Sequence, residues 1–251
     1  MLPLVDEVIR GDCLTVLRSL APGTVDLAYL DPPFNTGRTL SAANAAYGDT
    51  WPSLSAYLAF LRPRLEAVHR ALKPAGSILL HCDWRCSHHL RLMLDELFGV
   101  PGFVNHLIWT YGLGGSSPRR FARKHDDVLY YAKGSDYFFE PPLVPATSNR
   151  MKGQLKKASD VIRIPAINNM ALERTGYPTQ KPLALLSLLV NACCPPGGTV
   201  LDPFCGSGTT LVAATESGRR FLGIDINPDA VRISRDRLEP SLSPLVPLEN
   251  R

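Results

Sequence analysis

The sequence Val25-Asp26-Leu27-Ala28-Tyr29-Leu30-Asp31-Pro32-Pro33-Phe34 decides the fold that we expect for this chain. Its apolar first part, residues 25–30, predicts a short buried strand. Two consecutive prolines neither donate to a strand ladder nor continue into a helix, so the chain must leave the sheet there. Asp31 is therefore expected at the carboxyl end of a strand, where ligands bind in an open α/β sheet.

The residues after this strand offer a particular set of chemical groups. Asp31 has a carboxylate acceptor, Pro32 a backbone carbonyl in a stiff frame, and Phe34 an aromatic ring. Two acceptors and a ring face suit a flat ring that carries an amine, because each amine hydrogen then has an acceptor. A turn that merely contains two prolines is the alternative, and this segment alone leaves both interpretations open.

Composition sets the broad class. The chain has 251 residues, 45% of them hydrophobic, and a formal net charge of +4. This length suffices for one substantial α/β core and an inserted segment. The start, Met1–Glu7, has no basic and apolar leader and no long apolar run follows, so we expect a cytoplasmic protein without a membrane segment. The six cysteines predict reduced, mostly buried thiols. The positive charge permits a polyanionic partner without requiring one.

Strand and helix patterns alternate along the chain. The predicted strands are 7–10, 25–30, 77–83, 105–111, 127–133, 199–202 and 220–225, and the predicted helices are 13–20, 51–72, 87–98, 183–194, one that ends at Glu216, and 229–238. This alternation favours a parallel, doubly wound sheet. We expect Lys73–Gly76 to close the second helix and Pro182 to lie in the first turn of the fourth.

Two segments lack a clear period. Residues 35–50 are rich in small and polar side chains and predict a mobile active-site loop, with a disordered insert as the alternative. Residues 140–176 contain four prolines that break the periodicity, and they are interpreted as an insert outside the sheet. A small substrate-reading lobe and a partly disordered arm both fit this second segment.

Basic residues gather in two places. The first is the segment Gly112–His125, where Phe121 is flanked by Arg119, Arg120, Arg123 and Lys124. The second is in the insert, with Lys152, Lys156 and Lys157. Clustered cations with an aromatic residue between them are typical of contacts to a phosphate backbone, whereas a solvated basic loop is the plainer interpretation.

Several histidines and cysteines are candidate metal ligands. They are His81, Cys82, Cys86, His88 and His89. Their spacing matches no standard pair of zinc-binding elements, and three of them fall on a predicted helix. We therefore predict no metal site.

The carboxyl-terminal strands indicate a nucleoside site. The strand that ends at Asp202 runs into the glycine turn 204–208, which allows a ligand to approach the backbone closely. The next strand ends at Asp225, the position from which an acidic side chain receives ribose hydroxyls. The glycine turn contains no lysine, which excludes a P-loop. Asp12 follows the first strand and is either a helix N-cap or a ligand residue.

Taken together, these motifs resemble the amino-methyltransferases that modify DNA bases with S-adenosylmethionine, in their circularly permuted beta group. The resemblance rests on Asp31-Pro32-Pro33-Phe34, Tyr177-Pro178-Thr179-Gln180-Lys181-Pro182, Phe204-Cys205-Gly206-Ser207-Gly208 and Gly223-Ile224-Asp225, which follow one another in the order of that group. It implies a permuted, Rossmann-like methyltransferase sheet. The sequence departs from the family at Tyr177, where His is usual, and at Asp225, where Glu is frequent.

The resemblance also implies roles for single residues. Asp31, Pro32, Pro33 and Phe34 would form the catalytic motif. The cofactor would be held by Asp12, Thr179, Lys181, Asp202, Phe204, Gly206, Gly208, Thr209 and Asp225. Within this group Asp225 would bind the ribose, Asp12 would contact the adenine region, and Thr179 and Lys181 would close over the methionine end.

The expected organisation follows from these assignments. Residues 1–139 would form the catalytic half, 140–176 the target-recognition insert, 177–240 the cofactor-binding half and 241–251 a tail. Double-stranded DNA would be the partner, and monomer and homodimer both stay open. Asp31 favours N6 of adenine over N4 of cytosine as the methylated atom. A catalytically silent DNA-binding relative and an RNA or protein amine methyltransferase are the rival functions.

Overall fold

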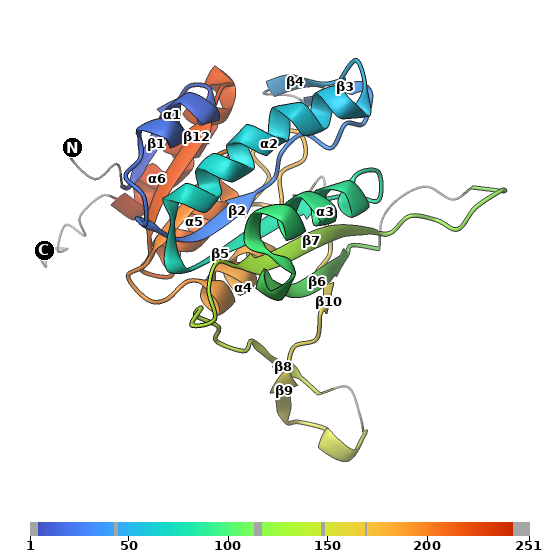
Figure 1. Ribbon diagram of the computed structural model, residues 1–251. Helices are drawn as coiled ribbons and strands as arrows, with labels where there is room; N and C mark the ends of the chain where they lie inside the picture. Colours follow the sequence, from blue (N-terminus) through green and yellow to red (C-terminus); the bar gives the residue numbers. More distant parts are fainter. Residues whose placement is uncertain (1–4, 43–44, 113–116, 147–148, 169, 243–251) are drawn as a thin grey trace, which may run out of the picture.

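An eight-stranded sheet forms the centre of the protein (Figure 1). The computed structural model describes residues 5–42, 45–112, 117–146, 149–168 and 170–242. In spatial order the strands are β1 (Glu7–Arg10), β12 (Arg220–Asp225), β11 (Thr199–Asp202), β2 (Val25–Leu30), β5 (Leu72–Cys82), β7 (His125–Ala132), β6 (Phe103–Thr110) and β10 (Val161–Arg163). The first five strands in this order, β1, β12, β11, β2 and β5, are parallel to one another. Strand β7 is antiparallel to both of its neighbours. The predicted, mostly parallel α/β sheet is thus confirmed.

Helices cover both faces of this sheet. One face carries α1 (Cys13–Ser19), α2 (Leu54–Ala71) and α3 (Ser87–Phe98), and the other carries α4 (Leu183–Cys193), α5 (Thr209–Glu216) and α6 (Pro228–Leu242). Side chains of β2 alternate between the two cores, with Ala28 and Leu30 facing the first and Leu27 and Tyr29 the second. A strand buried on both faces has to be apolar throughout, which is why this run carried no polar alternation.

The sheet order brings the two halves of the sequence together. Strands β11 and β12 come late in the chain, yet they lie between β1 and β2. Leu201 of β11 is in register with Ala28 of β2. Because parallel strands end at the same edge, Asp31 and Asp202 follow their strands on the same side of the sheet.

Residues 35–50 contain a β-hairpin, which corrects the prediction of a loop without regular structure. Strand β3 (Arg38–Ala42) pairs antiparallel with β4 (Ala45–Asp49). The buried Asp49 accepts hydrogen bonds from the backbone N–H groups of Asn35 and Thr36 and from the Thr36 hydroxyl. Small residues gave this segment no periodic pattern, and its backbone pairing and one buried carboxylate define the structure instead.

Residues 140–176 belong partly to the sheet, which corrects their interpretation as an insert outside it. A small hairpin of β8 (Leu143–Pro145) and β9 (Leu155–Lys157), with the short 3-10 helix η2 (Asn149–Met151), extends away from the body in Figure 1. Strand β10 then pairs parallel with β6 at the sheet edge. The Trp109 indole N–H also donates to the Ile164 carbonyl at 2.8 Å. A three-residue strand is too short to show a period in the sequence.

Other differences concern element ends. Strand β5 begins at Leu72, so Lys73–Gly76 lie in a strand with a bulge instead of closing the preceding helix. Pro182 is the N-cap of α4 and does not enter its first turn. A 3-10 helix, η1 (Val100–Gly102), precedes β6. Helix α6 extends to Leu242, and the rest of the predicted tail lies outside the described residues. Among the helices that the structure describes, none is long and apolar enough to span a bilayer.

Candidate functional site

Two cavities meet at Asp31, at the carboxyl edge of the parallel strands. The first has a volume of about 200 Å³ and the second about 330 Å³. Both are lined by Asp31, Tyr47, Thr179, Gln180 and Lys181. Asp31 follows β2, Tyr47 belongs to the β3–β4 hairpin, and the other three precede α4. The shared wall means that a group bound in one cavity lies beside a group bound in the other.

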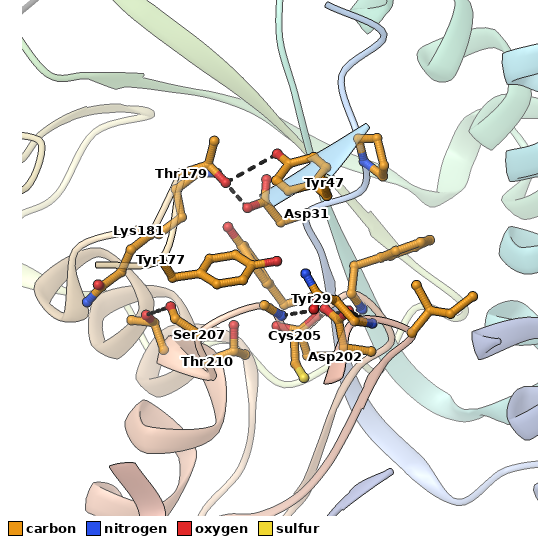
Figure 2. Close-up of a pocket in the computed structure, with 18 of the residues that line it drawn as sticks. Tyr29, Asp31, Tyr47, Tyr177, Thr179, Lys181, Asp202, Cys205, Ser207 and Thr210 are labelled. Carbon is orange, nitrogen blue, oxygen red and sulfur yellow. Dashed lines mark hydrogen bonds and ion pairs between the residues drawn. The ribbon is translucent and has the colours of Figure 1, made fainter. Parts of the chain in front are cut away.

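The first cavity is built on the glycine turn after β11. Gly206 has a φ of 51°, and an added Cβ there would lie 3.1 Å from the ring of Tyr177. Figure 2 shows the Tyr177 ring between Asp31, Tyr47 and Thr179 on one side and Ser207 and Thr210 on the other. Glycine is therefore needed at 206 both for its left-handed backbone and for the approach of this ring.

Asp225 ends β12 and points its carboxylate into the first cavity. Oδ2 accepts the Gly206 backbone N–H at 2.9 Å, and Oδ1 accepts the Asn227 N–H at 2.8 Å. Burial raises the pKa of Asp225, and the hydrogen bonds from Asn227 and Gly206 act against that rise. Each carboxylate oxygen keeps a further lone pair, so the group can still accept two hydroxyls.

Asp202 lies at the floor of the same cavity. Its side chain is buried, and Oδ1 accepts the Phe204 N–H at 3.1 Å. Burial raises the pKa of Asp202 to about 7, although hydrogen bonds from Thr210 and Phe204 lower it, and the charges of Asp31 and Asp225 raise it further. Among the residues that the structure describes, three carboxylates line this cavity, and Lys181 is the sole basic residue in its lining. The electrostatics therefore favour a cationic ligand.

The Asp31 carboxylate is bound on one oxygen only. Lys181 Nζ donates to Oδ2 at 2.5 Å, and both side chains are mostly buried, with 19% of Asp31 and 10% of Lys181 exposed. Oδ1 is buried and accepts no hydrogen bond from any residue that the structure describes. A buried acceptor left without a partner costs about 1–3 kcal/mol, so this oxygen is poised for a donor.

The second cavity has aromatic walls. Phe34, Trp109 and Tyr111 line it together with Pro32 and Asp126. The ring of Phe34 lies 5.7 Å from that of the buried His81, which supports it from beneath. Such a cavity suits a flat ring that stacks on Phe34 and presents an edge to Asp31.

Two predicted cofactor residues do not line either cavity. Asp12 is the N-cap of α1, accepts the Thr15 N–H at 3.1 Å, and forms an ion pair with Arg64. Gly208 is the N-cap of α5 with a φ of 73°, and an added Cβ would lie 2.7 Å from the Ser234 hydroxyl. Both residues shape the local fold. Asp31, Pro33, Thr179, Lys181, Asp202, Phe204, Gly206, Thr209 and Asp225 line the first cavity, and Pro32 and Phe34 line the second.

Several lining residues were missed in the sequence. Tyr29 and Tyr47 line the first cavity, and Trp109, Tyr111 and Asp126 the second. The sites predicted from the sequence follow the carboxyl ends of predicted strands. Because β7 is antiparallel, its amino end carries Asp126 to that same edge. The signal that could have found Asp126 is its place directly after the basic segment 119–124.

Both predicted basic clusters are at the surface. The described part of the first projects as an arm in Figure 1, and 97% of its Phe121 is exposed. Arg123 lies 3.3 Å from the centre of the Trp84 ring, which Arg85 also contacts. The second cluster, Lys152, Lys156 and Lys157, is exposed on and beside β9. Neither Trp84 nor Arg85 was singled out in the sequence.

Candidate metal ligands from the sequence form contacts with other side chains or are buried free thiols. His81 is paired with Tyr29 and Asp126, and all six cysteines are free and buried. Within the described ranges, no group of three or more His, Cys, Asp or Glu side chains could hold a metal ion.

A doubly wound sheet with a glycine turn after one strand and a carboxylate at the end of the next defines a Rossmann-like, nucleoside-binding protein. Within that class, the sequence of residues 25–236 matches the N6_N4_Mtase family, described as DNA methylase. The chain belongs to this family and is an S-adenosylmethionine-dependent DNA amino-methyltransferase.

Proteins of similar sequence are described as methyltransferases. The Type II methyltransferase M.ScaI of Streptomyces caespitosus is 28% identical over 92% of this chain and 80% of its own length. The DNA adenine methyltransferase YhdJ of Escherichia coli K12 is also 28% identical, over 92% of this chain and 82% of its own length.

Solved structures share the fold. The M1.HpyAVI–SAM complex superposes with a TM-score of 0.66 at 22% identity, over 92% of this chain and 98% of that one. The cytosine-N4-specific PvuII DNA methyltransferase gives a TM-score of 0.68 at 18% identity, over 92% and 85%. At these identities the likeness concerns the fold alone.

Asp202→Asn should change how stability depends on pH. The unfolded carboxyl has a pKa near 3.9 and the folded one about 7, so the native state holds a proton that the unfolded chain releases. Asp202 therefore stabilises the fold below about pH 4, and this contribution is lost as the pH rises towards 7, by about 1.4 kcal/mol for each pH unit. The asparagine is neutral throughout.

Urea unfolding of both proteins at about pH 5 and about pH 8 measures this difference. We expect the free energy of unfolding of the wild type, relative to Asp202→Asn, to be lower at the higher pH. A relative stability that does not change with pH would show that Asp202 is ionised in both states.

Proposed function

We propose that this protein methylates N6 of adenine in double-stranded DNA, at a specific sequence, by transfer from S-adenosylmethionine. The observation that carries the proposal is Asp31 Oδ1, a buried carboxylate oxygen at the junction of two cavities that has no donor in the described part of the chain. An amine hydrogen supplies that donor if the target base lies in the second cavity.

The first cavity fits the cofactor. Asp225 has lone pairs for two ribose hydroxyls, and Gly206 of the glycine turn lines the same cavity. Three carboxylates, those of Asp31, Asp202 and Asp225, suit a ligand with a positive sulfonium. When bound there, S-adenosylmethionine supplies an electrophilic methyl group. Thr179 and Lys181 lie between the two cavities and would border its methionine end.

The second cavity fits the target base. An exocyclic amine is a poor nucleophile because its lone pair is delocalised into the ring. Asp31 and the Pro32 carbonyl would accept its two hydrogens, which localises the lone pair. The amine nitrogen could then form the new N–C bond while the bond between the methyl carbon and the sulfonium sulfur breaks and its electron pair stays on sulfur. One amine proton then passes to the Asp31 carboxylate. Phe34 stacks on the base and holds it at a near-attack distance.

The basic clusters are proposed to hold the DNA. The target atom is inside a duplex, so the base must leave the helix to reach Asp31. Arg119, Arg120, Arg123 and Lys124 would contact phosphates beside the second cavity, because Tyr111 in its wall donates its backbone N–H to the Lys124 carbonyl. Lys152, Lys156 and Lys157 would contact a further stretch of backbone, and residues 140–176 would read the sequence.

The identity of one residue, Asp31, favours adenine over cytosine as the proposed target base. Asp at the first position of the catalytic motif is associated mainly with adenine and Ser mainly with cytosine, and this chain has Asp31. The relative YhdJ is described as an adenine methyltransferase. Both bases carry an amine beside a ring nitrogen, so a single pair of acceptors discriminates between them only by shape.

Asp225→Ala should weaken cofactor binding. The substitution removes the proposed acceptor of two ribose hydroxyls, and we expect a loss of about 1–3 kcal/mol in affinity for S-adenosylmethionine. Isothermal titration calorimetry measures this loss, with Asp229→Ala, four residues further on and half exposed, as the matched control. Unchanged affinity in Asp225→Ala would reject the ribose assignment.

Asp31→Ala should abolish methyl transfer, by about a hundred-fold or more, while cofactor affinity stays within a few-fold. The reason is that Asp31 faces the substrate amine, whereas the ribose site is at Asp225. Transfer of labelled methyl groups to duplex DNA measures the rate, with the exposed Asp136→Ala as control. Near-normal turnover in Asp31→Ala would contradict the proposed role of Asp31 in methyl transfer.

Nucleoside mass analysis of DNA from cells that express the protein identifies the base. We expect N6-methyladenine. N4-methylcytosine alone would overturn the choice of adenine and keep the roles of Asp31, Pro32 and Phe34. Methylation of RNA or of protein glutamine without methylation of DNA would reassign the substrate, and no transfer to any of them would favour a silent DNA-binding role.

A further inference from the structure

We propose that Lys181, which binds Asp31 Oδ2 in the free enzyme, leaves this carboxylate when the target amine binds Oδ1, and that Asp126 receives Lys181 when the base enters. This inference rests on the proposed function. It makes Asp126 a positioning residue, which acts through Lys181 and not on the reacting atoms.

Lys181 has the contacts that the target amine requires. Its Nζ donates to Asp31 Oδ2 at 2.5 Å and lies 5.2 Å from the centre of the Phe34 ring. The side chain is 10% exposed and borders both cavities. An ammonium and an exocyclic amine both donate N–H groups to a carboxylate, so the ammonium at Oδ2 and the amine at Oδ1 would compete for the negative charge of the same group.

The two nitrogens cannot share Asp31 through the reaction. The amine nitrogen gains positive charge as it bonds to the methyl group, and the ammonium already carries one. Like charges at such short range repel strongly at the effective dielectric of a protein surface. The ammonium therefore has to leave Asp31, and it needs another anion within reach of its flexible stem.

Asp126 is the carboxylate in place to receive it. Besides Asp31, the second cavity is lined by the carboxylates of Asp49 and Asp126. Asp49 already accepts three hydrogen bonds within the β3–β4 hairpin segment. Asp126 is 15% exposed, and its contacts leave lone pairs free.

The contacts of Asp126 keep it fixed and ionised. His81 Nε2 lies 3.3 Å from Oδ2, and the Tyr111 hydroxyl donates to Oδ1 at 3.3 Å. His81 is fully buried, and its Nδ1 lies 2.7 Å from the Tyr29 hydroxyl. Burial acts to raise the pKa of Asp126, but the hydrogen bond and charge of His81 and the charge of Lys181 hold it below its usual value.

A double-mutant cycle tests the transfer of Lys181. Asp126→Asn retains the shape of the side chain but removes its charge and replaces one of its two acceptor oxygens by an NH2 donor. We expect this change to slow single-turnover methyl transfer at least ten-fold in the wild type and less than two-fold in Lys181→Met, because no ammonium then needs a new partner. Equal factors in the two backgrounds would overturn the proposal, as would a Lys181→Met enzyme without activity.

A binding measurement tests the competition without catalysis. Two duplexes carry the mapped methylation sequence, one with the normal target base and one whose target base lacks the exocyclic amine, and both are bound with S-adenosylhomocysteine present. Removing Lys181 should increase the preference for the amine-bearing duplex at least five-fold. An unchanged preference in Lys181→Met would contradict the proposal.

Two controls separate this inference from other failures. Tyr111→Phe removes a hydrogen bond to Asp126 but leaves the charge of Asp126 in place. We expect this substitution to slow methyl transfer less than three-fold. A larger loss than in Asp126→Asn would assign the slower transfer in both variants to a change in cavity shape. Cofactor affinity and the melting temperature of each variant report on folding. A wild-type protein that transfers no methyl group to DNA would refute the proposed function, a result distinct from equal factors in the cycle.

Discussion

The parallel pairing of β11 with β2 is the constraint on which the site depends. Leu201 and Ala28 are partners in the ladder although they are far apart in the chain. Their strands end at one edge, and this edge gathers the carboxylates of Asp31, Asp202 and Asp225 around a single cavity. Burial of like charges is costly, and the raised pKa of Asp202 reflects it. A cationic ligand relieves that cost, so one strand pairing links fold and cofactor chemistry.

The antiparallel strand β7 has a comparable role for the substrate side. It pairs with β5, and its amino end places Asp126 in the second cavity, which Asp31 also lines. The buried His81 then connects Tyr29, which lines the first cavity, to Asp126, which lines the second. A polar network of this kind is rigid when its members are satisfied. The two cavities are consequently connected by this polar network as well as by the residues that line both of them.

Segments outside the sheet complete the site from three directions. The β3–β4 hairpin brings Tyr47 to Thr179, whose hydroxyls lie 3.3 Å apart, and so closes the wall that the cavities share. The arm with Phe121 and the β8–β9 hairpin project from the body and carry the cations (Figure 1). Rigid strands thus hold the carboxylates, while the surface segments offer positive charge to a polyanion.

The sequence by itself determined the strands and helices of the sheet, the placement of Asp31 and Asp225 at strand ends, and the family. These features follow from local patterns, because apolar runs, prolines and glycine turns act within a few residues of chain. Only the tertiary structure decided that β3 pairs with β4, that β10 joins the sheet, and that Asp12 and Gly208 are helix N-caps outside the lining of the two cavities. It also decided the pairing of Lys181 with Asp31, residues 150 positions apart. Such contacts depend on which strand ends meet in space, and no local pattern encodes that.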